Sequence, residues 1–396
     1  MSESALLAGS RESGSLSRAC GLKIGIFAPM TGRRAGGPET YDMELVRGLA
    51  RIDGTNQYTV YCVNDAAVGR LEVGRPNFRV HRLRPSVRFV SIPISLPLER
   101  LRRPVDLLHC TFVAPPFPMG RTLFSLLDLS PFSHPQFYPP LIRLRLTRLF
   151  SASIRKAEAV LCISEFTRND LLNRFNYPPD RAFVTHLGVD PRYRPVTDLH
   201  AVYAKLQSYG IEEPYILCVG KLQARKNTTG LLRAFHLLKK QERVPHKLLF
   251  VGRKTWTSAD VPPLVRELGL EKDILHTGHA PDDDLPYFYN GADALAYPSL
   301  FEGFGLPVVE AMACGTPVVT SNVTSLPEVA GDAAILVDPY NVEDIAGGLY
   351  RAVSGGAFVD EMRAKGLERA RQFTWESTAR KTLEAYQRFG AGGSSS

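Results

Sequence analysis

Two glutamates eight residues apart form the most informative chemical pattern in the sequence. Glu302 lies in the turn "FEGFG", and Glu310 lies in the apolar stretch "LPVVEAMA", where Pro307 fits the first turn of a helix. Eight residues are a little over two helical turns, so both carboxylates can point to one side. Gly303 and Gly305 would let the backbone approach a ligand, and the helix start would offer free N–H groups to a diphosphate. The same spacing also fits a surface acid followed by an acid on a helix face.

A basic turn, "ARKN", is the second candidate for chemistry. Arg225 and Lys226 follow the apolar run "YILCVG" and precede the helical pattern "NTTGLLRAFHLLKKQ". An anion site is expected at the end of a strand in a doubly wound sheet, and Asn227 or Thr228 can cap the helix while the two cations face a phosphate. Without that position, the turn would be interpreted as part of a solvated surface.

Two further loops carry weaker signals. The loop "TGRRAGGPE" contains Gly36 and Gly37 directly before a helical pattern, although it lacks the G-x-G-x-x-G spacing. The acidic run "PDDDLP", Asp282 to Asp284, resembles a site for Mg²⁺ or Mn²⁺. It also lies where a helix start is expected, and acids in a first turn satisfy N–H groups and the helix dipole without a metal. We therefore expect no metal site.

Short apolar runs alternate with amphipathic stretches and must position these residues. The strand candidates of the first half are "LKIGIFAP", "QYTVYCVN", "FRVHRL", "DLLHCTF", "TLFSLLDLS" and "AVLCIS", and those of the second half are "YILCVG", "HKLLFVG", "ILHTG", "ADALAYPS", "TPVVTSN" and "AAILVD". Such alternation predicts parallel sheets covered by helices. Because ligands bind at the carboxyl ends of the strands in open α/β sheets, the cleft between two such domains is the expected working site.

The pattern divides the chain into five parts. We expect a disordered leader over residues 1–19, a Rossmann-like domain over 20–200, a second Rossmann-like domain over 201–375, a terminal helix over 376–390 that packs back on the first domain, and a flexible tail over 391–396. The terminal helix looks exposed in the sequence, and the passage that runs on to about Glu213 looks polar and punctuated by prolines. The fold class predicted is α/β.

Charge and cysteine content narrow the choice of partners. Residues 1–200 hold 27 Lys/Arg and 17 Asp/Glu, a balance of +10, and the remainder holds 21 and 23, a balance of −2. A basic half fits a solvated face, an anionic membrane surface or a phosphorylated substrate, but no nucleic-acid motif accompanies the arginines. The six cysteines form no CxxC pair and lie mostly in apolar runs, as expected for a reducing compartment. No stretch is apolar for long enough to span a bilayer.

The segment "EGFGLPVVEAMACGTPVV" resembles the E-x7-E signature of family 4 retaining glycosyltransferases. The resemblance extends to "VGKLQARKNTTGLLRAF", "TGHAPDDDLPYFYNGADALAYPS" and "GDAAILVDP", and more loosely to "GRRAGGPETYDMELVRGLA". It covers the chain from about Lys23 onward. It implies the GT-B architecture, in which two Rossmann-like domains face a central cleft.

The resemblance also implies roles for individual residues. Glu310 would bind the ribose hydroxyls of a nucleotide, Glu302 the hydroxyls of the transferred sugar, and Arg225 with Lys226 would neutralise the leaving diphosphate. The backbone along the sugar and phosphates would come from Gly303, Phe304, Gly305 and Leu306, with Gly36 and Gly37 approaching from the other domain.

The chain departs from the family pattern at one point. Many family members carry a His-Asp pair after a strand of the first domain, whereas "TLFSLLDLSPFSHP" places Leu127 before Asp128. We expect Asp128, together with His109 or His134, on the acceptor side of the site.

From the resemblance we expect a cytoplasmic hexosyltransferase with a preference for mannose. It would need neither metal nor cofactor, and it would transfer the hexose from a nucleotide diphosphate sugar to a glycan or lipid-linked acceptor in cell-surface polysaccharide or glycolipid synthesis. Its basic half would bind the inner face of the cell membrane peripherally. The alternatives are a nucleotide-sugar-binding protein without turnover and another GT-B enzyme, such as an epimerase or a phosphorylase.

Overall fold

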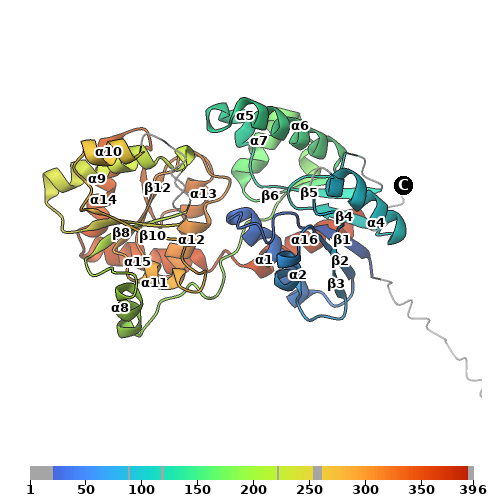
Figure 1. Ribbon diagram of the computed structural model, residues 1–396, viewed down its shortest axis with the longest axis horizontal. Coiled ribbons are helices and arrows are strands. Elements are labelled where there is room, and N and C mark those ends of the chain that lie inside the picture. Colours follow the sequence, from blue (N-terminus) through green and yellow to red (C-terminus); the bar gives the residue numbers. More distant parts are fainter. Residues whose placement is uncertain (1–20, 88–89, 117–119, 221–222, 253–260, 391–396) are drawn as a thin grey trace, which may run out of the picture.

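The computed structural model describes residues 21–87, 90–116, 120–220, 223–252 and 261–390. The chain forms two parallel β-sheets, each covered by helices, which lie side by side (Figure 1). The predicted leader 1–19, the tail 391–396 and Cys20 lie outside the described residues.

The first sheet has the strand order β3-β2-β1-β4-β5-β6-β7, and every neighbouring pair is parallel. The order reverses between β1 and β4, which is the point where a doubly wound sheet opens a crevice for ligands. Its strands are β1 (Lys23–Phe27), β2 (Gln57–Cys62), β3 (Phe78–Arg82), β4 (Leu107–Cys110), β5 (Arg121–Leu126), β6 (Ala159–Cys162) and β7 (Ala182–Val184).

The second sheet repeats this arrangement with the order β10-β9-β8-β11-β12-β13, again entirely parallel. Its order reverses between β8 and β11. The strands are β8 (Tyr215–Val219), β9 (Lys247–Val251), β10 (Ile274–Gly278), β11 (Ala294–Tyr297), β12 (Val318–Ser321) and β13 (Ile335–Val337).

Helices connect most of the consecutive strands and follow the last one. In the first half they are α1 (Gly37–Ile52), α2 (Asp65–Leu71), η1 (Ser91–Ser95), α4 (Leu96–Arg102), α5 (Ser130–Ser133), η2 (Pro135–Phe137), α6 (Pro140–Lys156), α7 (Glu165–Phe175) and η3 (Pro179–Arg181). In the second half they are α8 (Leu199–Gln207), η4 (Ala224–Lys226), α9 (Thr228–Glu242), α10 (Val261–Glu267), α11 (Leu285–Asn290), α12 (Leu306–Ala313), α13 (Leu326–Ala330), α14 (Val342–Val353), α15 (Ala357–Ala370) and α16 (Trp375–Gly390).

The alternation of side chains along the strands supplies a core on each face of the first sheet. In β5, Leu123 packs with the helices α1 and α16, while its neighbour Phe124 packs against α4 and α6 on the opposite face. This two-residue period is what a strand buried on both faces requires. The five described cysteines are free and buried, as the sequence predicted.

The helix α16 follows the second sheet in sequence but packs against α1 of the first. Its side chains Ala379, Ala385 and Tyr386 are fully buried, so the exposed appearance of this stretch in the sequence was misleading. The chain crosses between the sheets twice, and the two crossings touch where Val189 N–H donates to Phe373 O at 3.0 Å. A Cβ on Gly188 would lie 2.1 Å from the nitrogen of Trp375. Only glycine therefore fits at this crossing.

The passage that looked polar and irregular contains the helix α8, which Asp198 caps by accepting from Ala201 N–H. Within the described ranges, none of the helices combines the length and the apolar character that crossing a membrane requires.

Candidate active site

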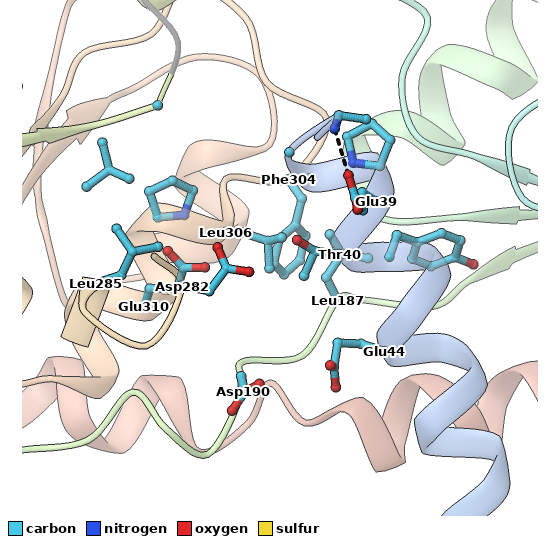
Figure 2. A pocket seen from close by; sticks show the side chains of 18 of the residues that line it. Glu39, Thr40, Glu44, Leu187, Asp190, Asp282, Leu285, Phe304, Leu306 and Glu310 are labelled. Atoms are coloured by element: carbon cyan, nitrogen blue, oxygen red, sulfur yellow. Dashed lines mark hydrogen bonds between the residues drawn. The ribbon is translucent and has the colours of Figure 1, made fainter. Parts of the chain in front are cut away.

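A cavity of about 820 Å³ lies between the carboxyl ends of the two sheets (Figure 2). Loops after β1, β5, β8, β9, β10 and β11 form its walls. Eleven of the predicted site residues line it, namely Gly36, Gly37, Asp128, Arg225, Lys226, Glu302, Gly303, Phe304, Gly305, Leu306 and Glu310. The other two predicted residues, His109 and His134, are not part of its lining.

The turn between β11 and α12 has a fixed backbone. Gly305 adopts φ +108° directly before α12, a conformation that disfavours any side chain. Ser325 Oγ donates to the carbonyls of Glu302 and Phe304 at 2.9 and 3.0 Å. A Cβ on Gly303 would lie 2.0 Å from Leu127 O of the first sheet, so glycine is needed where the two halves meet.

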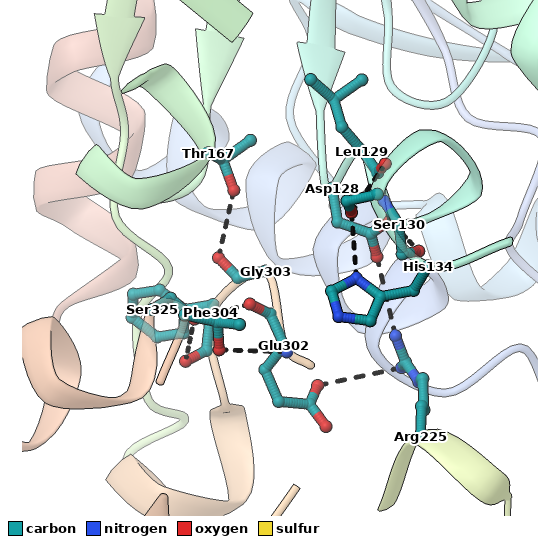
Figure 3. Close-up of polar contacts among 12 residues, drawn as sticks. Asp128, Leu129, Ser130, His134, Thr167, Arg225, Glu302, Gly303, Phe304 and Ser325 are labelled. Atoms are coloured by element: carbon teal, nitrogen blue, oxygen red, sulfur yellow. Dashed lines mark hydrogen bonds and ion pairs between the residues drawn. The ribbon is translucent and has the colours of Figure 1, made fainter. Parts of the chain in front are cut away.

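The two predicted cations lie beside Glu302. Lys226 Nζ is 2.6 Å from Glu302 Oε1 and also donates to the hydroxyl of Tyr297. Arg225 bridges two carboxylates, with Nη2 3.8 Å from Glu302 Oε2 and Nη1 3.6 Å from Asp128 Oδ2 (Figure 3). Arg225 Nε is buried and has no hydrogen-bond partner within the part of the chain that the structure describes.

The ionisation of these groups follows from their mutual charges. Burial alone would raise the pKa of Glu302, but the charges of Lys226 and Arg225 outweigh it and hold this pKa below its usual value. The charge of Glu302 raises the pKa of Arg225, whereas burial lowers the pKa of Lys226. Glu302 is therefore ionised and partly neutralises both cations.

Glu310 has a different environment although it belongs to the same motif. Its Oε2 accepts a hydrogen bond from the Tyr289 hydroxyl at 2.6 Å. Burial, followed by the charges of Asp282 and Asp190, raises the pKa of Glu310 to about 7. The two glutamates thus line one cavity but differ in ionisation. The pKa of Glu302 is lowered, whereas that of Glu310 is raised to near neutral pH.

The loop after β1 is held by Glu39 of α1. This buried carboxylate accepts from Gly32 N–H at 2.9 Å and Ala35 N–H at 2.8 Å and pairs with Arg70 at 2.6 Å. Gly36 precedes the helix with φ +74° and ψ −136°, which suits glycine. The loop therefore presents the backbone of Gly36 and Gly37 to the cavity from the first sheet.

Asp128 follows β5 and faces the cavity. Ser130 donates to its Oδ1 through both N–H and Oγ, at 2.9 and 2.5 Å. His134 lies beside Asp128 outside the cavity lining, with its ring stacked on Phe137 at 5.3 Å between centroids and tilted against Phe301 at 4.7 Å (Figure 3). Of the three residues predicted for the acceptor side, Asp128 is the one that the structure brings into contact with Arg225.

The prediction for His109 is wrong. Its side chain is fully buried, with Nδ1 2.7 Å from the Tyr386 hydroxyl and Nε2 2.6 Å from Ser125 Oγ. Burial lowers its pKa to about 3, so the ring is neutral. His109 joins β4 to α16 inside the core and cannot contact an acceptor there.

Two capping predictions also need correction. Asp284 precedes α11, but its carboxylate accepts from the Tyr209 hydroxyl at 2.6 Å and pairs with Lys205 at 2.9 Å, without capping the helix. Asn227 precedes α9 in a left-handed conformation, and its side chain donates to Pro339 O. Both side chains contact residues that are distant in sequence and do not contact the N–H groups of their own helices. Among the described residues, no group of three or more His, Cys, Asp or Glu could hold a metal ion.

Sequence reasoning missed several residues of the cavity. Glu39 stands three residues after Gly36, the position of the acidic partner in a capping box, and that spacing could have revealed it. Glu44 lies five residues further along α1, is 3% exposed and pairs with Arg47 at 2.5 Å. Its Oε2 has no hydrogen-bond partner in the described ranges. No local pattern identified Glu44.

Two doubly wound parallel sheets facing one cleft define the GT-B class of folds. Sucrose-phosphate synthase from Thermosynechococcus elongatus superimposes with a TM-score of 0.77 at 22% identity, covering 94% of this chain and 100% of that chain. WaaG, a glycosyltransferase involved in lipopolysaccharide biosynthesis, superimposes with a TM-score of 0.71 at 17% identity, covering 93% and 100%. The predicted GT-B architecture is confirmed.

Sequence comparison defines the family. The model of "Glycosyl transferases group 1" matches residues 205–373, and that of "Glycosyltransferase Family 4" matches residues 35–193. O-antigen chain mannosyltransferase B of Escherichia coli is 36% identical over 273 residues, which are 69% of this chain and 71% of that protein. The serotype-specific mannosyltransferase WbdA of Escherichia coli is 31% identical over 242 residues, 60% of this chain and 29% of that protein. The chain belongs to the family 4, group 1 glycosyltransferases.

Proposed function

We propose that this protein transfers a hexose, preferably mannose, from a nucleotide diphosphate sugar to a glycan or lipid-linked acceptor in cell-surface polysaccharide synthesis, with retention of the anomeric configuration. The observation that carries the proposal is the placement of Arg225 and Lys226 against Glu302 in the cavity. The mannosyltransferase names of the sequence relatives support the choice of sugar and process.

The leaving group accounts for the two cations. When the bond between the anomeric carbon and the diphosphate breaks, its electron pair passes to the diphosphate oxygen, and the new charge needs stabilisation. Arg225 and Lys226 supply that charge. In the proposed site they exchange part of their contact with Glu302 for the diphosphate, which frees that carboxylate for the sugar hydroxyls.

The acceptor attacks from the side of the leaving group. Its oxygen forms the new bond to the anomeric carbon as the diphosphate departs, and its proton passes to a diphosphate oxygen. No protein base behind the sugar is then needed. This mechanism agrees with Leu127, whose apolar side chain lines the cavity where many relatives carry a histidine.

Two carboxylates suit recognition of the acceptor. Asp128 lies beside Arg225 on the side of the first sheet, and Glu44 has a carboxylate oxygen without a partner in the described ranges. Carboxylate oxygens accept hydrogen bonds from sugar hydroxyls. We assign Asp128 to the attacking end of the acceptor and Glu44 to its more distant hydroxyls.

We further propose that the first half binds the inner face of the membrane peripherally. On one side of the first sheet, α6 exposes Leu141 by 82%, and α4 exposes Leu101 by 61%. The other exposed apolar side chains of this surface are Val87, Ile94, Leu98, Ile142 and Leu144, and exposed arginines accompany them at Arg84, Arg102, Arg103, Arg143, Arg145 and Arg148. Apolar side chains flanked by arginines suit an anionic lipid surface.

A donor screen followed by a transfer assay tests the function. Thermal shifts with GDP-mannose, UDP-glucose and ADP-glucose select the base, because a bound ligand stabilises the folded protein. The selected donor is then incubated with α-linked mannose oligosaccharides, and NMR of the product gives the anomeric configuration. Transfer with retention supports the proposal. Donor binding without turnover would leave a nucleotide-sugar-binding protein, and donor conversion without acceptor would indicate an epimerase.

A further inference from the structure

A carboxylate of the second half holds the start of a helix in the first half. Glu328 of α13 accepts hydrogen bonds from Glu165 N–H at 2.7 Å and Phe166 N–H at 3.0 Å, the first two residues of α7. Its Oε1 also lies 2.7 Å from His186 Nε2, just before the chain crosses to the second sheet. One side chain thus joins α13 to two segments of the first half.

The helix α7 is built to receive this carboxylate. Its own cap, Ser164, accepts from Thr167 N–H at 3.0 Å and leaves the N–H groups of Glu165 and Phe166 open. A helix start has unpaired N–H groups and a positive dipole end, which a carboxylate satisfies best. Although burial opposes it, the hydrogen bonds from His186 and from these two N–H groups hold the pKa of Glu328 below its usual value. The contact therefore persists as an ionised one at neutral pH.

The same helix start contacts the turn that carries Glu302. Thr167 Oγ1 donates to Gly303 O at 3.4 Å (Figure 3). Gly303 in turn lies against Leu127, next to Asp128 of the acceptor side. The beginning of α7 therefore meets the second half at two points, Gly303 and Glu328, and both contacts require the two halves to be in register.

The partner segment is firmly attached to its own half. Arg369 of α15 donates to Glu328 O at 2.6 Å and to Val329 O at 3.0 Å. A displacement of α7 from Glu328 would consequently be a displacement between the two halves. It would not be a local adjustment of α13.

We infer that Glu328 is a positioning residue, a latch that keeps the acceptor-side carboxylate Asp128 in register with the donor-side turn at Glu302. Glu328 is not part of the cavity lining and acts through α7 and Gly303. The inference rests on the proposed transfer reaction for its kinetic consequence. The contact between the halves can be tested without that reaction.

The test compares Glu328→Ala and Glu328→Gln with the wild type and with Asp344→Asn. Asp344 is a matched control, because its carboxylate accepts a backbone N–H from Asp338 inside the second half alone. Small-angle X-ray scattering with bound nucleoside diphosphate measures the separation of the halves, and calorimetry measures nucleotide affinity. Steady-state assays compare sugar transfer with donor hydrolysis by water.

With Glu328→Ala we expect a larger radius of gyration, unchanged nucleotide affinity, and transfer slowed roughly 10- to 100-fold, since small misplacements of reacting groups have effects of this size. The ratio of donor hydrolysis to sugar transfer should rise. Glu328→Gln should give a smaller effect, because its carbonyl still accepts one N–H.

Scattering and transfer equal to those of the wild type, or equal changes in Asp344→Asn, would overturn the inference. If Glu328→Ala does not fold, Glu328→Gln and Thr167→Val decide by the same measurements. If the wild type transfers no sugar, the proposed function fails. The role of Glu328 is then decided by the radius of gyration of the variants alone.

Discussion

Lys226 Nζ lies 2.6 Å from Glu302 Oε1, in a cavity that both residues line. The ion pair pre-organises both partners, because Glu302 is buried and Lys226 half-buried, and each charge would be destabilising without the other. In the proposed reaction, a diphosphate bound at Lys226 would weaken this pair and make the Glu302 carboxylate available to the sugar. On this proposal, the contact with Lys226 holds Glu302 in place for the transfer reaction.

The two glutamates of the motif should differ in kinetics. Glu310→Gln should raise the donor KM and change kcat little, because ribose contacts are nearly equal in the ground and transition states. Glu302→Gln should lower kcat roughly 10²-fold, since a contact at the sugar strengthens as positive charge develops. Steady-state kinetics and calorimetry on both variants provide the check. Equal losses of kcat, or loss of nucleotide binding in Glu302→Gln alone, would reverse the assignment.

Nucleotide affinity should depend on pH through Glu310, whose pKa is raised to about 7. The ionised carboxylate accepts ribose hydroxyl bonds better than the protonated form does, so nucleotide binding favours deprotonation. Affinity should therefore rise from pH 6 to pH 7, by up to about tenfold per pH unit, and level off above. Titration calorimetry at several pH values measures it. The ionisation of the nucleotide itself is the same with the Glu310→Gln variant as with the wild type. This variant should therefore lose only the part of the pH dependence that comes from Glu310. An unchanged profile in that variant would exclude Glu310.

Sugar transfer should survive excess EDTA. Arg225, Lys226 and the start of α9 already supply positive charge to a diphosphate, and Asp283 and Asp284 are engaged with Arg192 and Lys205. The transfer rate with and without chelator is the measurement. Activity that is abolished by EDTA and restored by Mn²⁺ would instead assign the acidic run to a metal.

The apolar and basic surface on α4 and α6 should bind anionic vesicles in a salt-sensitive manner. Replacing Leu141 and Leu144 by Asp should abolish flotation with vesicles that contain phosphatidylglycerol. The matched control replaces Leu199 and Tyr203 of α8, which are 59% and 66% exposed. Each arginine near the surface contributes about 1 kcal/mol at most, and salt screens it. Flotation that ignores lipid charge, or that falls equally in the control, would contradict the assignment.

Two adjacent glycines of α14 should respond oppositely to alanine. At Gly347 an added Cβ meets no atom within 4 Å, so Gly347→Ala should raise the free energy of unfolding by up to about 1 kcal/mol. At Gly348 the Cβ would lie 2.6 Å from Val337 Cγ1, a buried and rigid side chain. Gly348→Ala should therefore lower the free energy of unfolding by about 1–3 kcal/mol. Urea unfolding of both variants measures the difference, and similar values would show that α14 shifts freely.

The fold and the cavity lining supplied by the second half could be predicted because their signals are local. Each strand is an apolar run bounded by turn residues, and Glu302 and Glu310 share one turn and helix, so their spacing alone brings both to one cavity. Arg225 and Lys226 could be placed because the end of a strand fixes where they point.

The failures arose where the deciding partner is distant in sequence. His109 is buried by Tyr386, 277 residues later, and Glu328 meets Glu165 across 163 residues. Asp284 resembled a cap until Tyr209, 75 residues earlier, was found to donate to its carboxylate. Local propensity carries no information about such encounters, which depend on the assembled tertiary structure.

The return of α16 to the first sheet has a consequence for how the chain is made. Strand β4 leaves the ribosome long before Tyr386, yet Tyr386 covers His109 and fills part of the core beside it. Until α16 is synthesised, the first domain exposes a polar ring and an apolar groove that it cannot close by itself. The first half can therefore complete this core only after the second half has been synthesised.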